Sequence, residues 1–388
     1  MRDAGEEMKV LNTFKTYRHQ HLVSCILALF VLTSCGGLSR IQTPAPAPEG
    51  SATQFQESGD EQEKNHALSE KIYDYDSEDA VWIYRVMRQS PLKVALSPDD
   101  RALYLLRTAK AEENGKLIIL DRENYRTSGR IEVGKVPIAM ALTSDGKELY
   151  VANHLSDTVS VINTDAQRVV QTVPVGQRPI RIAISPSGEY AYVTNHGSDN
   201  ISILNLSTHL VDGEIPVGHR PCGVVFDPEG KHAYVVHHGG RDMAVIETAT
   251  SRVIKRIEVG KMPMGLGITP DGRTILVANE GSDTISVVDT SRLEVVKTLS
   301  AGAGPVEVSF SPDGKAAYVI HARSNDLSVI DAKEERVVAT LPVGQFPGSM
   351  ALTADGRFLY VTHEGAEDVS LMDTEQKSVV AQYAKVPL

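Results

Sequence analysis

Apolar and polar residues alternate with a period of two through most of the chain, and this alternation recurs in a longer repeat. Each copy opens on a proline, in most copies after a Val-Gly-x-x sequence. These prolines are Pro91, Pro137, Pro179, Pro221, Pro263, Pro305 and Pro347. The last six are 42 residues apart, and the first copy is longer by four residues, which fall within 110–116. One structural unit is therefore repeated seven times from residue 91 onward.

Each copy predicts four short strands. A run with bulky and small positions in alternation follows the proline, as in Met140-Ala141-Leu142, and ends at a turn such as Ser311-Pro312-Asp313-Gly314. Proline fixes φ at the first central position of such a turn and glycine supplies a positive φ at its exit, so the chain reverses into a second strand. A third strand and a further alternating run, such as Arg168–Val173, complete the unit.

Four antiparallel strands in about 40–45 residues, repeated seven times, are typical of a β-propeller. We therefore expect residues 80–388 to form an all-β, seven-bladed propeller of four-stranded antiparallel blades. Two segments, Tyr150-Val151-Ala152-Asn153 and Tyr192-Val193-Thr194-Asn195, together with the turns and the Val-Gly-x-x-Pro openings, resemble the YVTN family of propeller repeats. The resemblance covers Pro91–Leu388 and implies the propeller fold, in a family that includes surface, periplasmic and enzyme-associated proteins.

Two segments are candidates for the outer strand of the last blade. Ser378–Tyr383 completes the seventh copy as a fourth strand, yet Val81–Val86 stands where a fourth strand would precede Pro91. We expect one of them to form the outer strand of the last blade and the other to add beside it or to cover its edge. We favour a contribution of the N-terminal segment to closure, because its aromatic side chains would otherwise be exposed.

The chain before the repeats has the features of a targeting signal followed by a tether. Leu22–Thr33 is an apolar run of about a dozen residues, shorter than the roughly 20 that span a bilayer, and basic residues precede it. It ends at Leu32-Thr33-Ser34-Cys35, which resembles the lipobox of bacterial lipoproteins and implies lipidation of Cys35. We expect residues 1–34 to be a lipoprotein signal peptide and 35–79 to be a disordered, Pro-rich and acidic linker. The resemblance implies a lipid anchor in the bacterial outer membrane, with the propeller facing the periplasm or the cell surface.

Charge and cysteine content narrow the choice of partners. The formal net charge of −11 argues against nucleic acid, because such binding uses a surface rich in lysine and arginine. Three cysteines supply no disulfide framework, and Cys222, within the repeats, is expected to be an inert buried thiol.

Candidate chemistry gathers in loops that we expect on one face of the propeller. The last residue of each second strand and the residue after it form two columns, which hold six histidines: His154, His196, His237, His238, His321 and His363. Imidazole and carboxylate bind zinc, copper, nickel and iron, so these histidines are candidate ligands of a transition metal or another cofactor. The alternative is that histidine replaces the asparagine of the repeat as a hydrogen-bonding group of the turn.

A second group of charged residues lies beside the opening prolines: Lys93, Arg178, Arg181, Arg220 and Glu307, with His219 nearby. A positively biased patch there would attract an anionic ligand, and the alternative is ordinary solvated loop charge. The third and fourth copies combine both groups. The candidate ligand site therefore comprises Arg178, Arg181, His196, Arg220, His237 and His238.

These features favour binding over turnover. We expect a membrane-anchored, extracytoplasmic scaffold whose loop-rich face meets a protein or another extracytoplasmic ligand. The first alternative is a metal- or cofactor-dependent enzyme, or a lactonase-like hydrolase, that uses these histidines, since some seven-bladed propellers are lactonases. The second is single-stranded nucleic-acid binding, which the acidic charge disfavours.

Overall fold

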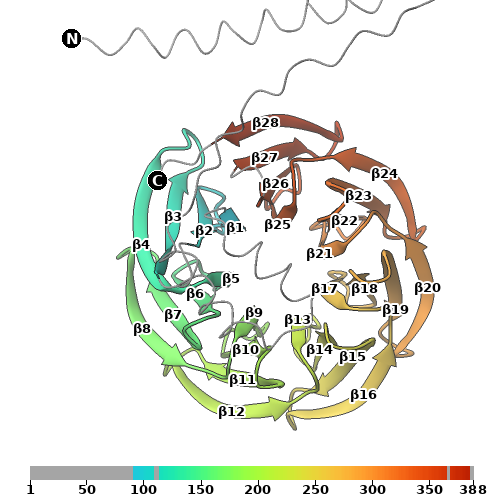
Figure 1. The fold of residues 1–388 in the computed structure, drawn as a ribbon, viewed down its shortest axis with the longest axis horizontal. Helices are drawn as coiled ribbons and strands as arrows, with labels where there is room; N and C mark the ends of the chain where they lie inside the picture. Colours follow the sequence, from blue (N-terminus) through green and yellow to red (C-terminus); the bar gives the residue numbers. More distant parts are fainter. Residues whose placement is uncertain (1–90, 109–112, 365–367, 385–388) are drawn as a thin grey trace, which may run out of the picture. The chain divides into compact units, whose positions relative to one another are not determined.

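The computed structural model describes residues 91–108, 113–364 and 368–384, and these form a ring of seven antiparallel sheets (Figure 1). The expected signal peptide, Cys35, the linker and Val81–Val86 lie outside these residues. In each sheet four strands pair in sequence order, which gives blade 1 as β1-β2-β3-β4 and blade 7 as β25-β26-β27-β28. The expected all-β, seven-bladed propeller of four-stranded blades is confirmed.

The first two strands of each blade lie nearest the central axis (Figure 1). The first strands are β1 (Pro91–Leu96), β5 (Pro137–Leu142), β9 (Pro179–Ile184), β13 (Pro221–Phe226), β17 (Pro263–Ile268), β21 (Pro305–Phe310) and β25 (Pro347–Leu352). The second strands are β2 (Ala102–Arg107), β6 (Glu148–Asn153), β10 (Tyr190–Asn195), β14 (His232–His237), β18 (Thr274–Asn279), β22 (Ala316–His321) and β26 (Phe358–His363).

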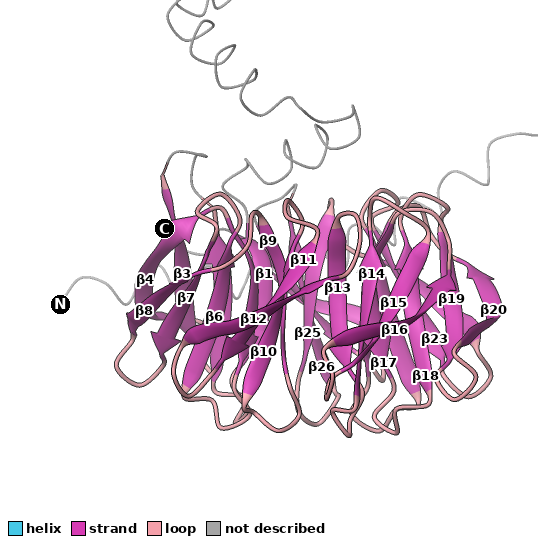
Figure 2. Ribbon diagram, turned by 90° about the horizontal axis from the view of Figure 1, so that it is seen from below, coloured by secondary structure: helices cyan, strands magenta, loops and turns pink. Residues whose placement is uncertain are grey.

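The third and fourth strands lie progressively farther from the axis (Figure 1). The third strands are β3 (Asn114–Asp121), β7 (Thr158–Asn163), β11 (Asn200–Asn205), β15 (Asp242–Glu247), β19 (Thr284–Asp289), β23 (Asp326–Asp331) and β27 (Asp368–Asp373). The fourth strands are β4 (Thr127–Lys135), β8 (Arg168–Pro174), β12 (Leu210–Pro216), β16 (Arg252–Glu258), β20 (Glu294–Ser300), β24 (Arg336–Pro342) and β28 (Ser378–Ala384). In the side view of Figure 2, loops join the strands at both faces of the ring.

The turns between first and second strands have the chemistry that the sequence predicts. In blade 6 the N–H of Gly314 donates to the carbonyl of Ser311 at 2.8 Å, and Gly314 has a φ of 70°. The hydroxyl of Ser311 donates to Asp313 Oδ1 at 2.6 Å and accepts the N–H of Ala316 at 3.0 Å. The side chains thus satisfy the backbone groups that a tight reversal leaves unpaired.

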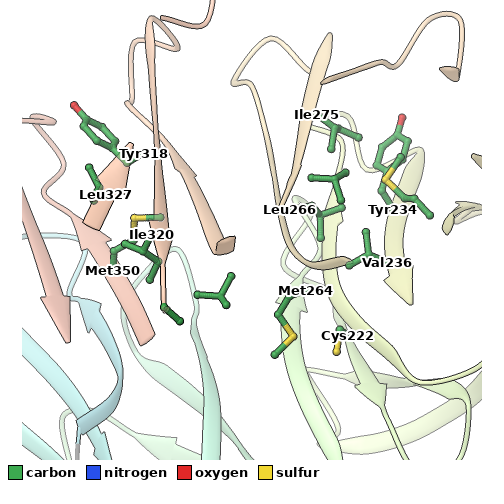
Figure 3. Packing of buried hydrophobic residues seen from close by; sticks show 14 of the residues in the cluster. Cys222, Tyr234, Val236, Met264, Leu266, Ile275, Tyr318, Ile320, Leu327 and Met350 are labelled. Atoms are coloured by element: carbon green, nitrogen blue, oxygen red, sulfur yellow. The ribbon is translucent and has the colours of Figure 1, made fainter. Parts of the chain in front are cut away.

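The hydrophobic core lies between blades, where bulky residues of one sheet pack against the face of the next sheet that carries the smaller residues. Figure 3 shows Met264 and Leu266 of β17 beside Cys222 of β13 and Val236 of β14. The tyrosines of the second strands belong to these layers, and Tyr150 is fully buried. Each interface therefore joins two copies, which explains why the unit needs its neighbours for stability.

The C-terminal strand closes the ring. β28 pairs with β27 from Asp368↔Ala384 to Asp373↔Ser378, so it is the outer strand of blade 7. The N-terminal segment that we favoured for closure lies outside the described residues, so that part of the expectation stays a prediction. No helix within the described ranges is long and apolar enough to cross a bilayer.

Candidate functional site

The two kinds of loop that carry the candidate residues meet on one face of the ring. The N–H of His196, just after β10, donates to the carbonyl of Arg178, just before β9, at 3.0 Å. His238 and Arg220 make the same contact in blade 4, also at 3.0 Å. These bonds recur from blade to blade, so the histidine columns and the residues before each first strand occupy neighbouring loops, as expected.

Arg178 and Arg220 are held in a left-handed backbone conformation, each with a φ of 54°. The N–H of Arg178 donates to Asp157 Oδ1 of blade 2 at 2.8 Å, and that of Arg220 donates to Asp199 Oδ1 of blade 3 at 2.9 Å. A non-glycine residue with positive φ costs about 1 kcal/mol or more, so it persists where neighbours fix it. Here an aspartate of the preceding blade and a loop N–H of the same blade fix both arginines.

The first histidine column lies inside the blades. In blades 2, 3 and 5 the residue at this position is asparagine, and in blade 2 Asn153 Oδ1 accepts the N–H of Gly134 at 2.9 Å. His363 replaces it in blade 7, where Nε2 accepts the N–H of Gly344 at 3.0 Å and Nδ1 contacts Asp368 Oδ1 at 2.7 Å. His363 therefore accepts the same glycine N–H in blade 7 that Asn153 accepts in blade 2.

His321 and His237 are also turned into their own blades. His321 Nδ1 lies 2.6 Å from Asp326 Oδ1, and His237 Nδ1 lies 3.4 Å from Asp242 Oδ1. Burial lowers the pKa of His321 and of His363, although their aspartates oppose the shift. The hydrogen bond from His237 is the largest cause that lowers the pKa of Asp242, to about 2.

The second column forms an arc that passes from blade to blade. The ring centroids of His196 and His238 are 6.1 Å apart, and His238 Nε2 lies 3.6 Å from Glu280 Oε2. Arg323 continues the arc, with Nη1 3.8 Å from Glu280 Oε1. At the other end, His154 Nδ1 donates to the carbonyl of Pro179 in the next blade at 3.3 Å.

Burial lowers the pKa of two imidazoles of this arc, His154 and His196. The pKa of His154 is lowered to about 4, chiefly by burial. The pKa of His196 falls well below its ordinary value, first because of burial and then because His154, His238, Arg220 and Arg178 lie near it. These four groups therefore lie near enough to His196 to act on its pKa. We call these five residues the loop cluster: His154, Arg178, His196, Arg220 and His238.

Cys222 has a contact that the sequence did not predict. It is buried, as expected, yet its Sγ lies 3.7 Å from Nδ1 of His196, and its carbonyl accepts the hydroxyl of Thr194 at 2.8 Å. The thiol therefore adjoins the loop cluster. This contact could have been anticipated from the position of Cys222 directly after Pro221, at the start of β13, which brings it close to the loop of blade 3 that carries His196.

The six histidines do not converge. Three are turned into their own blades and three lie along the arc, and across the described residues no group of three or more His, Cys, Asp and Glu side chains is arranged to hold a metal ion. A metal site requires its ligand atoms to surround one point, so the six-histidine metal site that the columns indicated is not assembled.

Three members of the second charged group, Lys93, Arg181 and Glu307, meet near the central axis, and one of them is negative, so they do not form a uniformly positive patch. Lys93 of β1 places Nζ 2.5 Å from Glu307 Oε2 of β21, and Arg181 of β9 places Nη2 3.9 Å from the same oxygen. Burial is the largest cause that lowers the pKa of Lys93, to about 8, and Arg181 adds to the shift while Glu307 opposes it. We call these residues the axial triad.

His219 is outside both clusters. It is an exposed loop residue whose Nδ1 lies 3.3 Å from Asp199 Oδ2. Of the six residues of the candidate ligand site, Arg178, His196, Arg220 and His238 lie in the loop cluster. Arg181 belongs to the axial triad, and His237 is buried inside its own blade.

Comparisons with known proteins agree with this architecture. A family model described as "YNCE-like beta-propeller" matches residues 266–357, and one described as "Lactonase, 7-bladed beta-propeller" matches residues 111–210. No curated protein matches the sequence. Among solved structures, a chain of Kuenenia stuttgartiensis hydrazine synthase is similar, with a TM-score of 0.68 and 22% identity over 74% of this chain and 96% of that chain. The last likeness shows the fold alone.

The fold and these matches define the class. The chain is a seven-bladed β-propeller similar to the lactonase and YNCE-like propellers.

Proposed function

We propose that the protein binds a small anionic ligand at the loop cluster and works as an extracytoplasmic binding protein held to the outer membrane by lipid on Cys35. The observation that carries the binding proposal is that Arg178 and Arg220 hold equivalent places beside His196 and His238, whose ring centroids are 6.1 Å apart. Both arginines are half-buried, and the pKa of Arg178 is lowered first by burial and then by Arg220. A shared anion would relieve their repulsion and accept charge-assisted hydrogen bonds from both.

The surrounding groups fit a compact anion. An imidazole N–H donates a hydrogen bond, so His196 and His238 can orient an anion that the arginines attract. Guanidinium suits both carboxylate and phosphate, because its donors match two oxygens at once. The chemistry that we assign to the ligand is therefore that of a small carboxylate or phosphate.

Calorimetric titration with inorganic phosphate and with succinate tests this proposal. We expect saturable binding by the wild-type protein and at least about a tenfold loss in the Arg178→Gln/Arg220→Gln variant, since a hydrogen bond to a charged group contributes about 1.5–3 kcal/mol. Arg252→Gln, an exposed change on the outer strand β16, is the matched control and should bind as the wild type does. Equal affinity in all three proteins, or no binding of either probe by the wild type, would contradict the proposal.

The membrane anchor has its own test. In Cys35→Ala the thiol that would carry the diacylglyceryl group is absent, and each buried acyl methylene contributes about 0.8 kcal/mol to membrane binding. We expect the variant to move from the membrane fraction to the soluble fraction after cell disruption. A variant that stays in the membrane fraction would sink the lipoprotein proposal and leave the ligand proposal intact.

Lactonase-like hydrolysis is a second candidate. The segment that matches the lactonase model contains four of the candidate site residues named in the sequence analysis: His154, Arg178, Arg181 and His196. Guanidinium groups near a neutral imidazole could stabilise the oxyanion of a lactone under attack by water. Hydrolysis of a panel of five- and six-membered lactones, which His196→Gln should slow by about 100-fold or more, separates this activity from binding alone.

A further inference from the structure

The axial triad joins side chains from blades that are not neighbours. β1, β9 and β21 belong to blades 1, 3 and 6, and all three are first strands beside the axis (Figure 1). Lys93 and Arg181 both approach Oε2 of Glu307, at 2.5 Å and 3.9 Å. The inner wall of the propeller thus holds an amine, a carboxylate and a guanidinium within reach of one another.

Glu307 is positioned by blade 7 as well. Its Oε1 lies 3.4 Å from the hydroxyl of Ser349 and 3.5 Å from the N–H of Met350 on β25. These contacts are long and hold one oxygen, while the other oxygen faces Lys93. The carboxylate is therefore oriented to exchange a proton with this amine.

The three side chains are mostly buried without being sealed off. The exposed fractions are 14% for Lys93, 16% for Glu307 and 22% for Arg181. Burial disfavours the ammonium form, and the pKa of Lys93 is about 8 where a free lysine has 10.5. A sizeable fraction of this amine is neutral at physiological pH, and only the neutral amine is a nucleophile.

We propose that Lys93 is a reactive amine that forms a reversible Schiff base with a small 2-oxo carboxylic acid at the inner wall of the propeller. This site uses residues other than those of the loop cluster, so it stands apart from the anion site proposed above. The guanidinium of Arg181 suits the carboxylate of such a ligand, and the keto or aldehyde carbon is the group that lysine attacks.

The chemistry balances with these residues alone. Glu307 takes a proton from the ammonium of Lys93, and the neutral nitrogen forms a bond to the carbonyl carbon as the carbonyl oxygen receives that proton. The resulting carbinolamine loses its hydroxyl group with one further proton as water, which leaves a carbon–nitrogen double bond. The products are one imine and one water, and hydrolysis reverses the sequence. A protonated imine keeps the positive charge beside Glu307.

Reductive trapping of the full-length protein tests the inference. Glyoxylate and sodium cyanoborohydride are added at pH 7.5, and peptide mass spectrometry follows the carboxymethyl group that the reduced imine leaves on each lysine. We expect Lys93 to be modified at least about tenfold faster than Lys231, which is exposed and whose pKa is raised by Glu229. The rate at Lys93 should level off above about pH 8, whereas the rate at Lys231 should keep rising.

Three variants make the outcome decisive. Glu307→Gln keeps the side-chain volume and removes the carboxylate that opposes the lowering of the Lys93 pKa, so the pH at which the labelling rate of Lys93 levels off should fall, while Lys93→Arg should abolish labelling at this position. Arg178→Gln/Arg220→Gln should label as the wild type does, which separates this inference from the loop-cluster proposal. Labelling of Lys93 no faster than that of Lys231, in wild-type protein with an intact circular dichroism spectrum, would overturn the inference.

Discussion

At the scale of single residues, neighbours in sequence have different environments. His237 and His238 are adjacent, yet His237 contacts Asp242 of its own blade and His238 approaches Glu280 of the next blade. Successive residues of an extended chain point to opposite sides, so a His-His pair need not share a site. The sequence located both columns, but it did not show which of them faces the neighbouring blade.

Acid should destabilise the protein through His154. Its pKa is about 4 in the folded state and 6.5 in the unfolded state, so the unfolded chain binds more protons between these values and stability falls as pH drops from 6.5 toward 4. The expected loss at pH 5 relative to pH 7.5 is about 2 kcal/mol from this group. Urea unfolding of the wild type and of His154→Gln at both pH values measures it. An equal pH dependence in the two proteins would show that His154 is not the cause.

His363 should tolerate asparagine and not alanine. Asn153 and Asn279 already accept the corresponding glycine N–H groups in blades 2 and 5, so His363→Asn should change the free energy of unfolding by less than about 1 kcal/mol. His363→Ala leaves the N–H of Gly344 and the carboxylate of Asp368 without this partner and should cost about 2–3 kcal/mol. Chemical denaturation compares the two variants, and an alanine variant as stable as the asparagine variant would refute the assignment.

At the scale of elements, the size of one side chain decides how closely neighbouring blades approach. Lys93, Arg181 and Glu307 share a column of the first strands with Gly223 and Gly265. A Cβ atom on Gly265 would lie 2.4 Å from the carbonyl oxygen of Val306 in the next first strand. The glycines therefore allow close backbone packing in blades 4 to 6, and the charged residues share the rest of this column with Ala139 and Ser349.

Gly265→Ala should therefore destabilise the propeller. The added methyl group meets backbone that cannot move without shifting β21, and overpacking of this kind costs about 1–3 kcal/mol. Gly213→Ala on β12 is the matched control, because its Cβ would meet nothing closer than 3.9 Å, and it should change stability by less than about 0.5 kcal/mol. Thermal unfolding distinguishes the two, and equal effects would show that close approach of the first strands is not the reason for the glycine.

Strands and turns could be predicted from the sequence because their determinants are local. The period of two, the proline before each first strand and the Ser-Pro-Asp-Gly turns fix the elements within each copy. The axial triad could not be predicted in the same way, because Lys93 belongs to the first repeat and Glu307 to the sixth. Their contact depends on how the ring closes and on how far the two side chains reach, and the repeat pattern specifies neither.

At the scale of the whole molecule, the seam between blades 7 and 1 must hold without a continuous chain across it. Arg122 Nε donates to the hydroxyl of Tyr360 at 3.1 Å, and the hydroxyls of Tyr125 and Tyr360 are 2.9 Å apart. The rings of Tyr125 and Tyr383 stack with centroids 4.0 Å apart, which ties the last strand, β28, to the first blade. Asp100 adds a contact from its Oδ2 to the N–H of Ala354 at 3.0 Å.

Tyr360→Phe should weaken this seam in particular. The variant keeps the buried ring and removes a hydroxyl that joins two residues of blade 1, so we expect a loss of about 1–2 kcal/mol in the free energy of unfolding. Tyr104→Phe is the matched control, because Tyr104 fills the same column but packs between blades 1 and 2, where the chain is continuous. Hydrogen exchange locates the effect: amides of β1, β25 and β26 should exchange faster in Tyr360→Phe, while those of blade 4 keep their relative protection. Faster exchange spread evenly over all blades would mean that the ring opens as one cooperative unit and that its seam is no weaker than its other interfaces.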